Sequence, residues 1–231
     1  YNIEALDKEI HLTVTVRFSQ KELQNFQLFY FDVRGSAEPI RMLLYFKKID
    51  FSDVRWTVDQ WHRLRKSFQL TDVPALRVDR MTLYGRNNIM RFLGVELDMA
   101  GTTSCDYYFC DNMSEFLSSS FDTIMRWRYY DQALVNNYKN KITDHYIPVF
   151  LRKMEQFLKD CKVDGISRPW FLGQKMTWAD ILFGYILMEL QQVFGPSIKL
   201  RNFKFCCSFF DRFILIPIIE RYMFHRHPTV W

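Results

Sequence analysis

The sequence has no run of apolar residues that approaches the ~18 needed for a membrane-spanning helix, so we expect no membrane span. Its first residues, YNIEALDKEIHL, lack the basic-then-apolar pattern of a secretory signal. It also lacks internal repeats and low-complexity tracts. These absences exclude repeat and fibrous architectures and favour a globular chain.

Cysteine pairs and basic clusters are lacking too. The 5 cysteines are odd in number and include no Cys-x-x-Cys pair, which favours a reduced, cytoplasmic setting. The net charge of +5 comes from Lys and Arg residues that are scattered among Asp and Glu, so we expect no nucleic-acid partner. His225 and His227 form a His-x-His without a third ligand in sight, so we expect no metal site.

Apolar and aromatic residues are abundant. They make up 48% and 17% of the 231 residues, with 22 Phe, which is enough to bury a substantial core. The length suits one large domain or two small ones. Residues 1–25 stand apart, because Leu12, Val14, Val16 and Phe18 alternate with polar residues as in a strand. This segment either pairs with a sheet edge or a partner, or is a loosely attached extension.

Strand and helix patterns alternate between residues 26 and 97. We predict strands in FQLFYF at 26–31 and FSDVRW at 51–56, and two more in VPALRVD and MTLY. We predict helices after Pro39, at 59–67 and at 86–95. The short helix between the first two strands implies a parallel pair. The order β-α-β-α-β-β-α is that of a thioredoxin-like domain.

The chain after a polar linker at 98–104 shows only helical periodicity, so we expect no strand within 140–195. Thr177 and Asp180 have the spacing of a capping box at the start of an apolar helix, which is a folding signal. The last predicted helix ends at Pro228.

The segments YFDVRGSAEPIRMLL, VPAL and FLGQKMTWADILFG resemble the glutathione S-transferase family, and Tyr30-Phe31 with Arg34-Gly35 and Trp61 is similar to its sigma class. The resemblance covers roughly residues 26–231. It implies an α/β plus all-α fold, with a thioredoxin-like N-terminal domain followed by a helical glutathione-transferase C-terminal domain. The expected organisation is an extension at 1–25, a glutathione-site domain at 26–97 and an all-helical domain at 98–231.

The resemblance implies a catalytic role for Tyr30, at the end of the first strand. In the family, a tyrosine there donates a hydrogen bond to the glutathione sulfur. A free thiol has a pKa of about 8.5, and a donor to its charged form lowers that pKa and favours the nucleophilic thiolate. The alternative is a tyrosine that only fills the end of a strand.

Four further positions match glutathione contacts of the family: Trp61, Arg65, Val73 and Pro74. The resemblance places Trp61 and Arg65 near the glycine end of glutathione. It implies a cis Pro74, and pairing of the Val73 backbone with the cysteinyl part. The alternative for the first two is a helix that packs Trp61 and leaves Arg65 solvated.

Three residues depart from the family pattern. Asp72 replaces a usual Gln, and Gly85-Arg86 replaces a usual Gln-Ser pair that holds the γ-glutamyl carboxylate. Arg86 either pairs with that carboxylate or folds onto Asp72 and fills the site. An acid near an anionic ligand is unfavourable, so we expect a divergent site with weak or absent glutathione binding.

The resemblance also suggests residues on the first long helix and just after it. Asp111 matches an acidic position that reaches the neighbouring subunit's site, the alternative being an ordinary exposed charge. Met125, Trp127 and Tyr130 lie near the expected second-substrate pocket, the alternative being core packing.

Two functions remain open. The first is an enzyme that joins glutathione, its co-substrate, to apolar electrophiles or isomerises them, with no other cofactor. The second is a non-catalytic relative that serves in a protein assembly. The resemblance and the aromatic excess both favour a homodimer or a larger assembly over a monomer. Retention on immobilised glutathione would separate the two functions.

Overall fold

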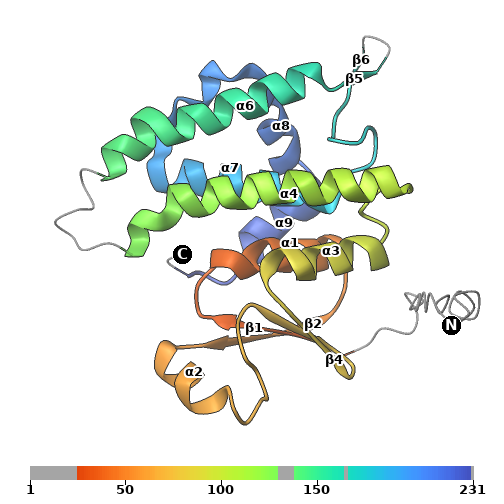
Figure 1. Ribbon diagram of the computed structural model, residues 1–231, viewed down its shortest axis with the longest axis vertical. Coiled ribbons are helices and arrows are strands. Elements are labelled where there is room, and N and C mark those ends of the chain that lie inside the picture. The colour runs from red at the N-terminus through yellow and green to blue at the C-terminus, as the bar shows by residue number, and fades with distance from the viewer. Residues whose placement is uncertain (1–24, 130–137, 164–165, 230–231) are drawn as a thin grey trace, which may run out of the picture.

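The computed structural model describes residues 25–129, 138–163 and 166–229. The alternating segment predicted within residues 1–25 lies outside these ranges, apart from Asn25. Figure 1 shows a sheet at one end of the molecule, a layer of helices above it, and a larger set of helices beyond that layer.

A four-stranded mixed sheet forms the first part of the fold. Its order is β2-β1-β3-β4, with β1 and β2 parallel and the other pairs antiparallel. Its strands are β1 (Phe26–Phe31), β2 (Phe51–Trp56), β3 (Ala75–Val78) and β4 (Met81–Tyr84). The predicted strands, the parallel first pair and the thioredoxin-like arrangement are therefore confirmed.

Helices cover both faces of this sheet (Figure 1). α1 (Glu38–Phe46), which follows a 3₁₀ turn at Gly35–Ala37, and α3 (Arg86–Glu96) lie between the sheet and the remaining helices, whereas α2 (Val58–Leu64) lies on the opposite face. Pro39 stands in the first turn of α1, where a missing N–H costs nothing. The buried face of α1 then joins the main core.

The rest of the described chain is mainly helical. Its α-helices are α4 (Ser104–Met125), α6 (Ile147–Asp160), α7 (Trp178–Phe194), α8 (Lys204–Ile214) and α9 (Pro217–His225). Shorter turns are η3 (Arg126–Tyr129), the π-helical η4 (Ile142–Tyr146), η5 (Gly195–Ile198) and η6 (Leu200–Asn202). The last helix thus ends at His225, three residues before the predicted end at Pro228.

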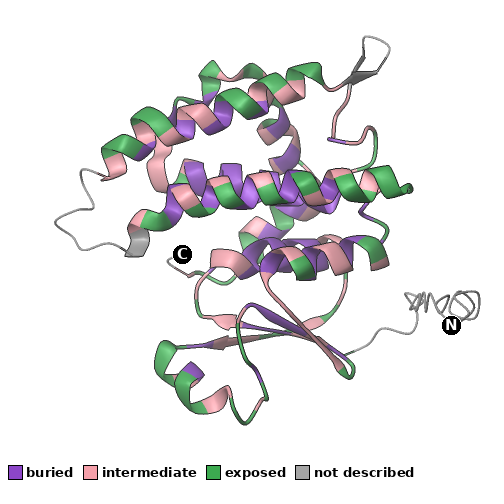
Figure 2. Ribbon diagram, in the orientation of Figure 1, coloured by how far each residue is buried: buried purple, intermediate pink, exposed green. Residues whose placement is uncertain are grey.

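α7 is the centre of the core, since every residue from Trp178 to Leu190 is buried. Buried positions gather on the inner sides of α4 and its neighbours (Figure 2). By length and composition alone, Trp178–Ile198 would suffice to cross a membrane, but 67% of its most apolar 18-residue window is buried inside the fold. Length and apolarity here reflect a helix that is surrounded by other helices.

A small hairpin corrects the expectation of no strand within 140–195. β5 (Lys162–Val163) pairs antiparallel with β6 (Ile166–Ser167) directly after α6. The sequence between them is Asp-Gly, at 164–165, which is a dipeptide favoured in tight hairpin turns. The helical interpretation overlooked this short signal, because strands of two residues show no periodicity.

The predicted capping box at the start of α7 is confirmed. The Thr177 N–H and the Thr177 hydroxyl donate to Asp180 Oδ2 at 2.8 and 2.7 Å. The Phe171 N–H donates to Asp180 Oδ1 at 2.9 Å. Burial raises the pKa of the Asp180 carboxyl to about 6, although these hydrogen bonds lower it.

Candidate functional site

Tyr30 is the second-last residue of β1 and is half-buried against the ring of Phe31. Its Oη accepts a hydrogen bond from the Ser36 N–H at 3.2 Å. A tyrosine hydroxyl that accepts one bond still carries its own proton to donate. The local geometry therefore suits a hydrogen-bond donor at this position.

The loop after β1 is held tightly around Tyr30. Gly35 has a φ of +44°, and a Cβ at this position would lie 2.8 Å from Tyr30 Oη, so a side chain would displace the hydroxyl. The buried Arg41 donates through Nη1 to the carbonyls of Val33 and Arg34, at 3.2 and 3.3 Å. The loop thus has a fixed shape.

Trp61 and Arg65 lie on α2 and at its end. Thr57 and Gln60 form a capping box that begins this helix. Trp61 is buried and packs against Trp56 and Phe31 in a second apolar cluster. The Arg65 guanidinium lies 5.8 Å from the Trp61 ring centroid, which is within cation–π range. Trp61 is packed as the alternative expects, whereas Arg65 is half-buried over its ring and not fully solvated, so the glutathione contacts of this pair stay a prediction.

The peptide bond between Val73 and Pro74 is cis, as predicted. The Pro74 carbonyl accepts a hydrogen bond from the Gly85 N–H at 2.9 Å, which brings this turn against the start of α3. The exposed Asp72 carboxylate accepts a hydrogen bond from the Val73 N–H at 2.8 Å. The backbone donor that the resemblance assigns to glutathione is therefore bonded to a side chain of the same chain.

The start of α3 differs from one of the sequence expectations. Gly85 is the N-cap, with a φ of +82° and no side-chain cap. The buried Arg86 lies 3.5 Å from Asp122 of α4 and donates to Asn87, so it is turned away from Asp72. Of the two alternatives for Arg86, the structure does not show the pair with Asp72, because Arg86 stands on the face of α3 that packs against α4.

Asp111 pairs within its own chain. Its carboxylate accepts a hydrogen bond from Arg91 Nε at 2.6 Å, which joins α4 to α3. Asn87 adds a second link through Glu115, at 3.0 Å. The expected role of Asp111 at a neighbouring subunit's site stays a prediction.

Two of the three residues predicted for the second-substrate pocket, Met125 and Trp127, pack inside the helical part. Met125 is buried in the main core. Trp127 contacts the Phe194 ring and has the Lys139 ammonium 4.4 Å from its ring centroid. Tyr130 lies outside the described residues. The structure places the first two as the core-packing alternative expects.

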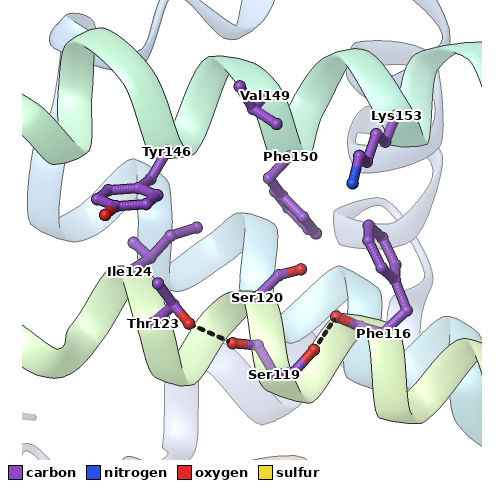
Figure 3. A pocket seen from close by; sticks show the side chains of 9 residues that line it. All are labelled: Phe116, Ser119, Ser120, Thr123, Ile124, Tyr146, Val149, Phe150 and Lys153. Atoms are coloured by element: carbon purple, nitrogen blue, oxygen red, sulfur yellow. Dashed lines mark hydrogen bonds between the residues drawn. The ribbon is translucent and has the colours of Figure 1, made fainter.

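A groove of about 320 Å³ lies between α4 and α6 (Figure 3). Three hydroxyl side chains of α4 face it, and Phe150 and Lys153 of α6 lie across from them. Its lining residues are Phe116, Ser119, Ser120, Thr123, Ile124, Tyr146, Val149, Phe150 and Lys153. They include neither Tyr30 nor the predicted second-substrate residues.

His225 and His227 near the C-terminus and the five cysteines make the following contacts. His225 Nδ1 lies 2.9 Å from the Arg221 carbonyl, and His227 Nδ1 lies 3.7 Å from Asp32. The five cysteines are free. Burial raises the pKa of the Cys110 thiol to about 12, so this cysteine is not a reactive thiolate.

The sequence did not predict the contacts that α7 makes with the loop after β1. Tyr185 on α7 donates to the Gly35 carbonyl at 2.8 Å, and Arg34 donates to Gln192 of α7 at 2.6 Å. The tyrosine and glutamine gave no local signal, since they lie in a helix that reads simply as apolar core.

The fold combines a thioredoxin-like sheet with a helical second part. Tyr30 lies near the end of the first strand, and a cis-proline turn lies at Pro74. These features define a protein of the glutathione-transferase fold class. A family model described as "Glutathione S-transferase, C-terminal domain" matches residues 119–226. The Caenorhabditis elegans protein "Glutathione S-transferase P 10" is 30% identical over 210 residues, which cover 89% of this chain and 94% of the relative. The chain therefore belongs to the glutathione S-transferase family.

Other relatives agree. "Hematopoietic prostaglandin D synthase" of Mus musculus is 28% identical over 90% of this chain and 99% of its own length. The structure of rat hPGDS complexed with a quinoline superposes with a TM-score of 0.78 at 26% identity, covering 89% of this chain and 99% of the rat chain. A structure described as monomeric Na-GST-3, from the hookworm Necator americanus, has a TM-score of 0.78 at 20% identity, covering 90% and 100%, and shows the shared fold.

Proposed function

We propose that this protein is a glutathione transferase relative in which Tyr30 donates a hydrogen bond to the sulfur of glutathione, but which binds glutathione weakly and conjugates it poorly. The Ser36 N–H fixes Tyr30 Oη and leaves the hydroxyl proton for a ligand. Stabilising the thiolate would prepare it to attack an apolar electrophile, or to isomerise one.

The observation that carries weak binding is the hydrogen bond from the Val73 N–H to Asp72, at 2.8 Å. Glutathione would have to displace a carboxylate in order to pair with this backbone. Its own carboxylates would then lie near a negative charge, which disfavours the complex. Of the other family contacts, Trp61 is buried beside Trp56 and Phe31 and Arg65 lies over its ring, so both would have to leave this packing in order to bind glutathione.

The start of α3 adds to this proposal. A helix N-terminus is a natural anion site because its first N–H groups have no partner within the helix. Here Gly85 offers no side chain, and Arg86 is turned toward Asp122. The γ-glutamyl carboxylate would meet backbone donors only. Each missing charged hydrogen bond weakens binding by roughly one to two decades.

Titration calorimetry with glutathione tests the proposal. We expect Asp72→Gln to raise the affinity, and Asp72→Gln with Arg86→Ser to raise it by about 10- to 100-fold. Asp50→Asn is the matched control, since Asp50 is an exposed acid next to Phe51, at the opposite end of β2 from Trp56. Gly85 is left unchanged, because its φ of +82° would strain a replacement side chain.

Turnover of a standard electrophile completes the test. Tyr30→Phe in the double variant should remove the activity while the affinity for glutathione persists. Tight binding by the unmodified protein would contradict the weak-binding proposal. Absence of binding and turnover in every variant would contradict the glutathione role of Tyr30.

We also propose a cytoplasmic homodimer. Val95, at the end of α3, and Tyr107 and Tyr108, near the start of α4, are large apolar residues that are exposed in the single chain. A partner subunit that covers them would remove this apolar surface from water. Light scattering at micromolar concentration should give a dimer mass, and Tyr108→Ser should lower it. Phe224→Ser, at an exposed position on α9, is the control, and a monomer mass for the unmodified protein would reject the homodimer.

A further inference from the structure

One peptide group joins two tyrosine hydroxyls from different parts of the fold. Tyr185 of α7 donates through its hydroxyl to the Gly35 carbonyl at 2.8 Å. The N–H of the next residue, Ser36, donates to Tyr30 Oη at 3.2 Å. The Gly35 carbonyl and the Ser36 N–H belong to the same planar unit, so neither can rotate without the other.

We propose that Tyr185 is a positioning residue for Tyr30, and that it acts through the Gly35–Ser36 peptide. This inference rests on the proposed role of Tyr30 as a hydrogen-bond donor to a thiol. By fixing the carbonyl, Tyr185 sets the plane of the peptide and aims the Ser36 N–H at Tyr30 Oη. The helical part of the protein thereby controls the direction of the Tyr30 hydroxyl.

Burial makes this contact rigid. Tyr185 is fully buried, and its ring packs edge-on against Phe121 of α4, with ring centroids 5.7 Å apart. Its hydroxyl therefore has little freedom to leave the Gly35 carbonyl. Hydrogen bonds in series also polarise one another, so a donor to the carbonyl strengthens the N–H of the same peptide.

A second contact with α7 supports the same peptide from its other side. The Arg34 guanidinium donates to Gln192 at 2.6 Å and lies 3.7 Å from Glu189, and both partners are on α7. Arg34 and Glu189 are almost completely buried. The loop is thus attached to α7 at two consecutive residues, Arg34 and Gly35, and a Cβ on Gly35 would lie 2.8 Å from Tyr30 Oη.

The experiment uses the ligand-free full chain labelled with ¹⁵N-serine, in which Ser36→Ala assigns the Ser36 amide signal. In the unmodified protein we expect this amide to be protected from hydrogen exchange. Tyr185→Phe removes a single oxygen and should speed exchange of the Ser36 amide by about tenfold. Tyr138→Phe is the matched control, since Tyr138 also donates to a carbonyl, that of Thr123, at 3.5 Å, and should leave Ser36 unchanged.

A purely structural role predicts a different pattern. If Tyr185 only stabilised the fold, Tyr185→Phe would speed exchange at serines throughout the chain, such as Ser114 and Ser118 of α4. The proposal requires a change confined to Ser36. An unprotected Ser36 amide in the unmodified protein, or equal changes in Tyr185→Phe and Tyr138→Phe, would overturn it.

Kinetics add a second measurement. In the Asp72→Gln, Arg86→Ser background, adding Tyr185→Phe should lower kcat several-fold and leave the KM for glutathione unchanged. An unchanged kcat in an active background would overturn the positioning role. An inactive background would count against the proposed function alone, because the exchange measurement needs no glutathione and still decides the inference.

Discussion

α7 and α3 begin with opposite chemistry. The N-cap of α7 is the buried Thr177, and the Asp180 side chain of its capping box accepts three hydrogen bonds from the protein. α3 begins at Gly85, which has no side chain to cap the helix. The first N-terminus is satisfied by the protein itself, whereas the second leaves its donors open. The side chain at the N-cap therefore separates the two helix starts: a threonine completes the box at α7, whereas a glycine at α3 cannot cap the helix.

A third helix, α4, distinguishes the effect of burial on stability from the effect of the capping box itself. α4 begins with the same kind of box, made by Thr103 and Asp106, but Thr103 is exposed, Asp106 is only half-buried, and the hydrogen bonds between them are exposed. Water can replace an exposed cap, while it cannot reach a buried one. Variants at α7 and α4 therefore measure what burial adds to one and the same motif.

The largest expected effect is that of Asp180→Ala. It leaves the Phe171 N–H and two donors of Thr177 buried without their acceptor. Because each unsatisfied buried donor costs about 1–3 kcal/mol, we expect the free energy of unfolding to fall by about 3 kcal/mol or more. Urea unfolding monitored by circular dichroism measures this change.

Asp106→Ala at the start of α4 is the matched control for that variant. Loss of an exposed cap should lower the free energy of unfolding by about 1 kcal/mol. Equal losses in the two variants would show that burial adds nothing to the box, and the contrast between the helix starts would fail.

The second prediction concerns pH. Burial raises the pKa of Asp180 from its ordinary 3.8 to about 6 in the folded protein. The folded chain then holds this proton more readily than the unfolded chain, so the contribution of Asp180 is largest below pH 4 and decreases as pH rises through 6. A shift of about two pKa units corresponds to about 3 kcal/mol.

Asp180→Asn tests this pH dependence, because an amide does not titrate. The stability advantage of the unmodified protein over Asp180→Asn should be larger at pH 4 than at pH 7.5, by up to about 3 kcal/mol. Unfolding curves at both pH values give the difference. A difference that is the same at both pH values would mean that Asp180 has an ordinary pKa.

Thr177→Ala should have a smaller effect. It removes the hydroxyl that donates to Asp180 but keeps the Thr177 N–H in place. We expect a loss of about 1 kcal/mol, with a larger effect on folding yield than on glutathione affinity. Thermal melts of Thr177→Ala and of Thr103→Ala at α4 check it, and an unchanged melt for Thr177→Ala would contradict a functioning cap.

The sequence was sufficient for features that have a period or a local motif. Alternation and apolar runs gave the four strands of the sheet, and the Thr-x-x-Asp spacing gave the start of α7. The β5–β6 hairpin was missed, because two-residue strands carry no period and only the Asp-Gly dipeptide marks them. Local signals therefore predict elements only when those elements are long enough to repeat.

Contacts of site residues with residues far away in the sequence could not be predicted from the sequence. The direction of Arg86 depends on which face of α3 meets α4, and that packing is a tertiary property. Likewise, 150 positions separate Tyr185 from Gly35. The resemblance singled out Tyr30 and Pro74, while their contacts with Ser36 and Gly85 became visible only in the fold.

The smallest expected effect is that of Asp111→Asn, which weakens the attachment of α3 to α4 away from the helix start. Asp111 and Arg91 are 36% and 39% exposed, so their ion pair is well solvated despite its 2.6 Å distance. Exposed pairs contribute about 0.2–1 kcal/mol, and we expect the free energy of unfolding to fall by about 0.5 kcal/mol, an effect that shrinks at high salt.

A double-mutant cycle with Arg91→Leu isolates the interaction energy of the Asp111–Arg91 pair. A loss above about 1.5 kcal/mol would show that α3 depends on this pair more than a solvated contact allows. A fall in glutathione affinity without any loss of stability would instead support the predicted reach of Asp111 into a neighbouring subunit's site.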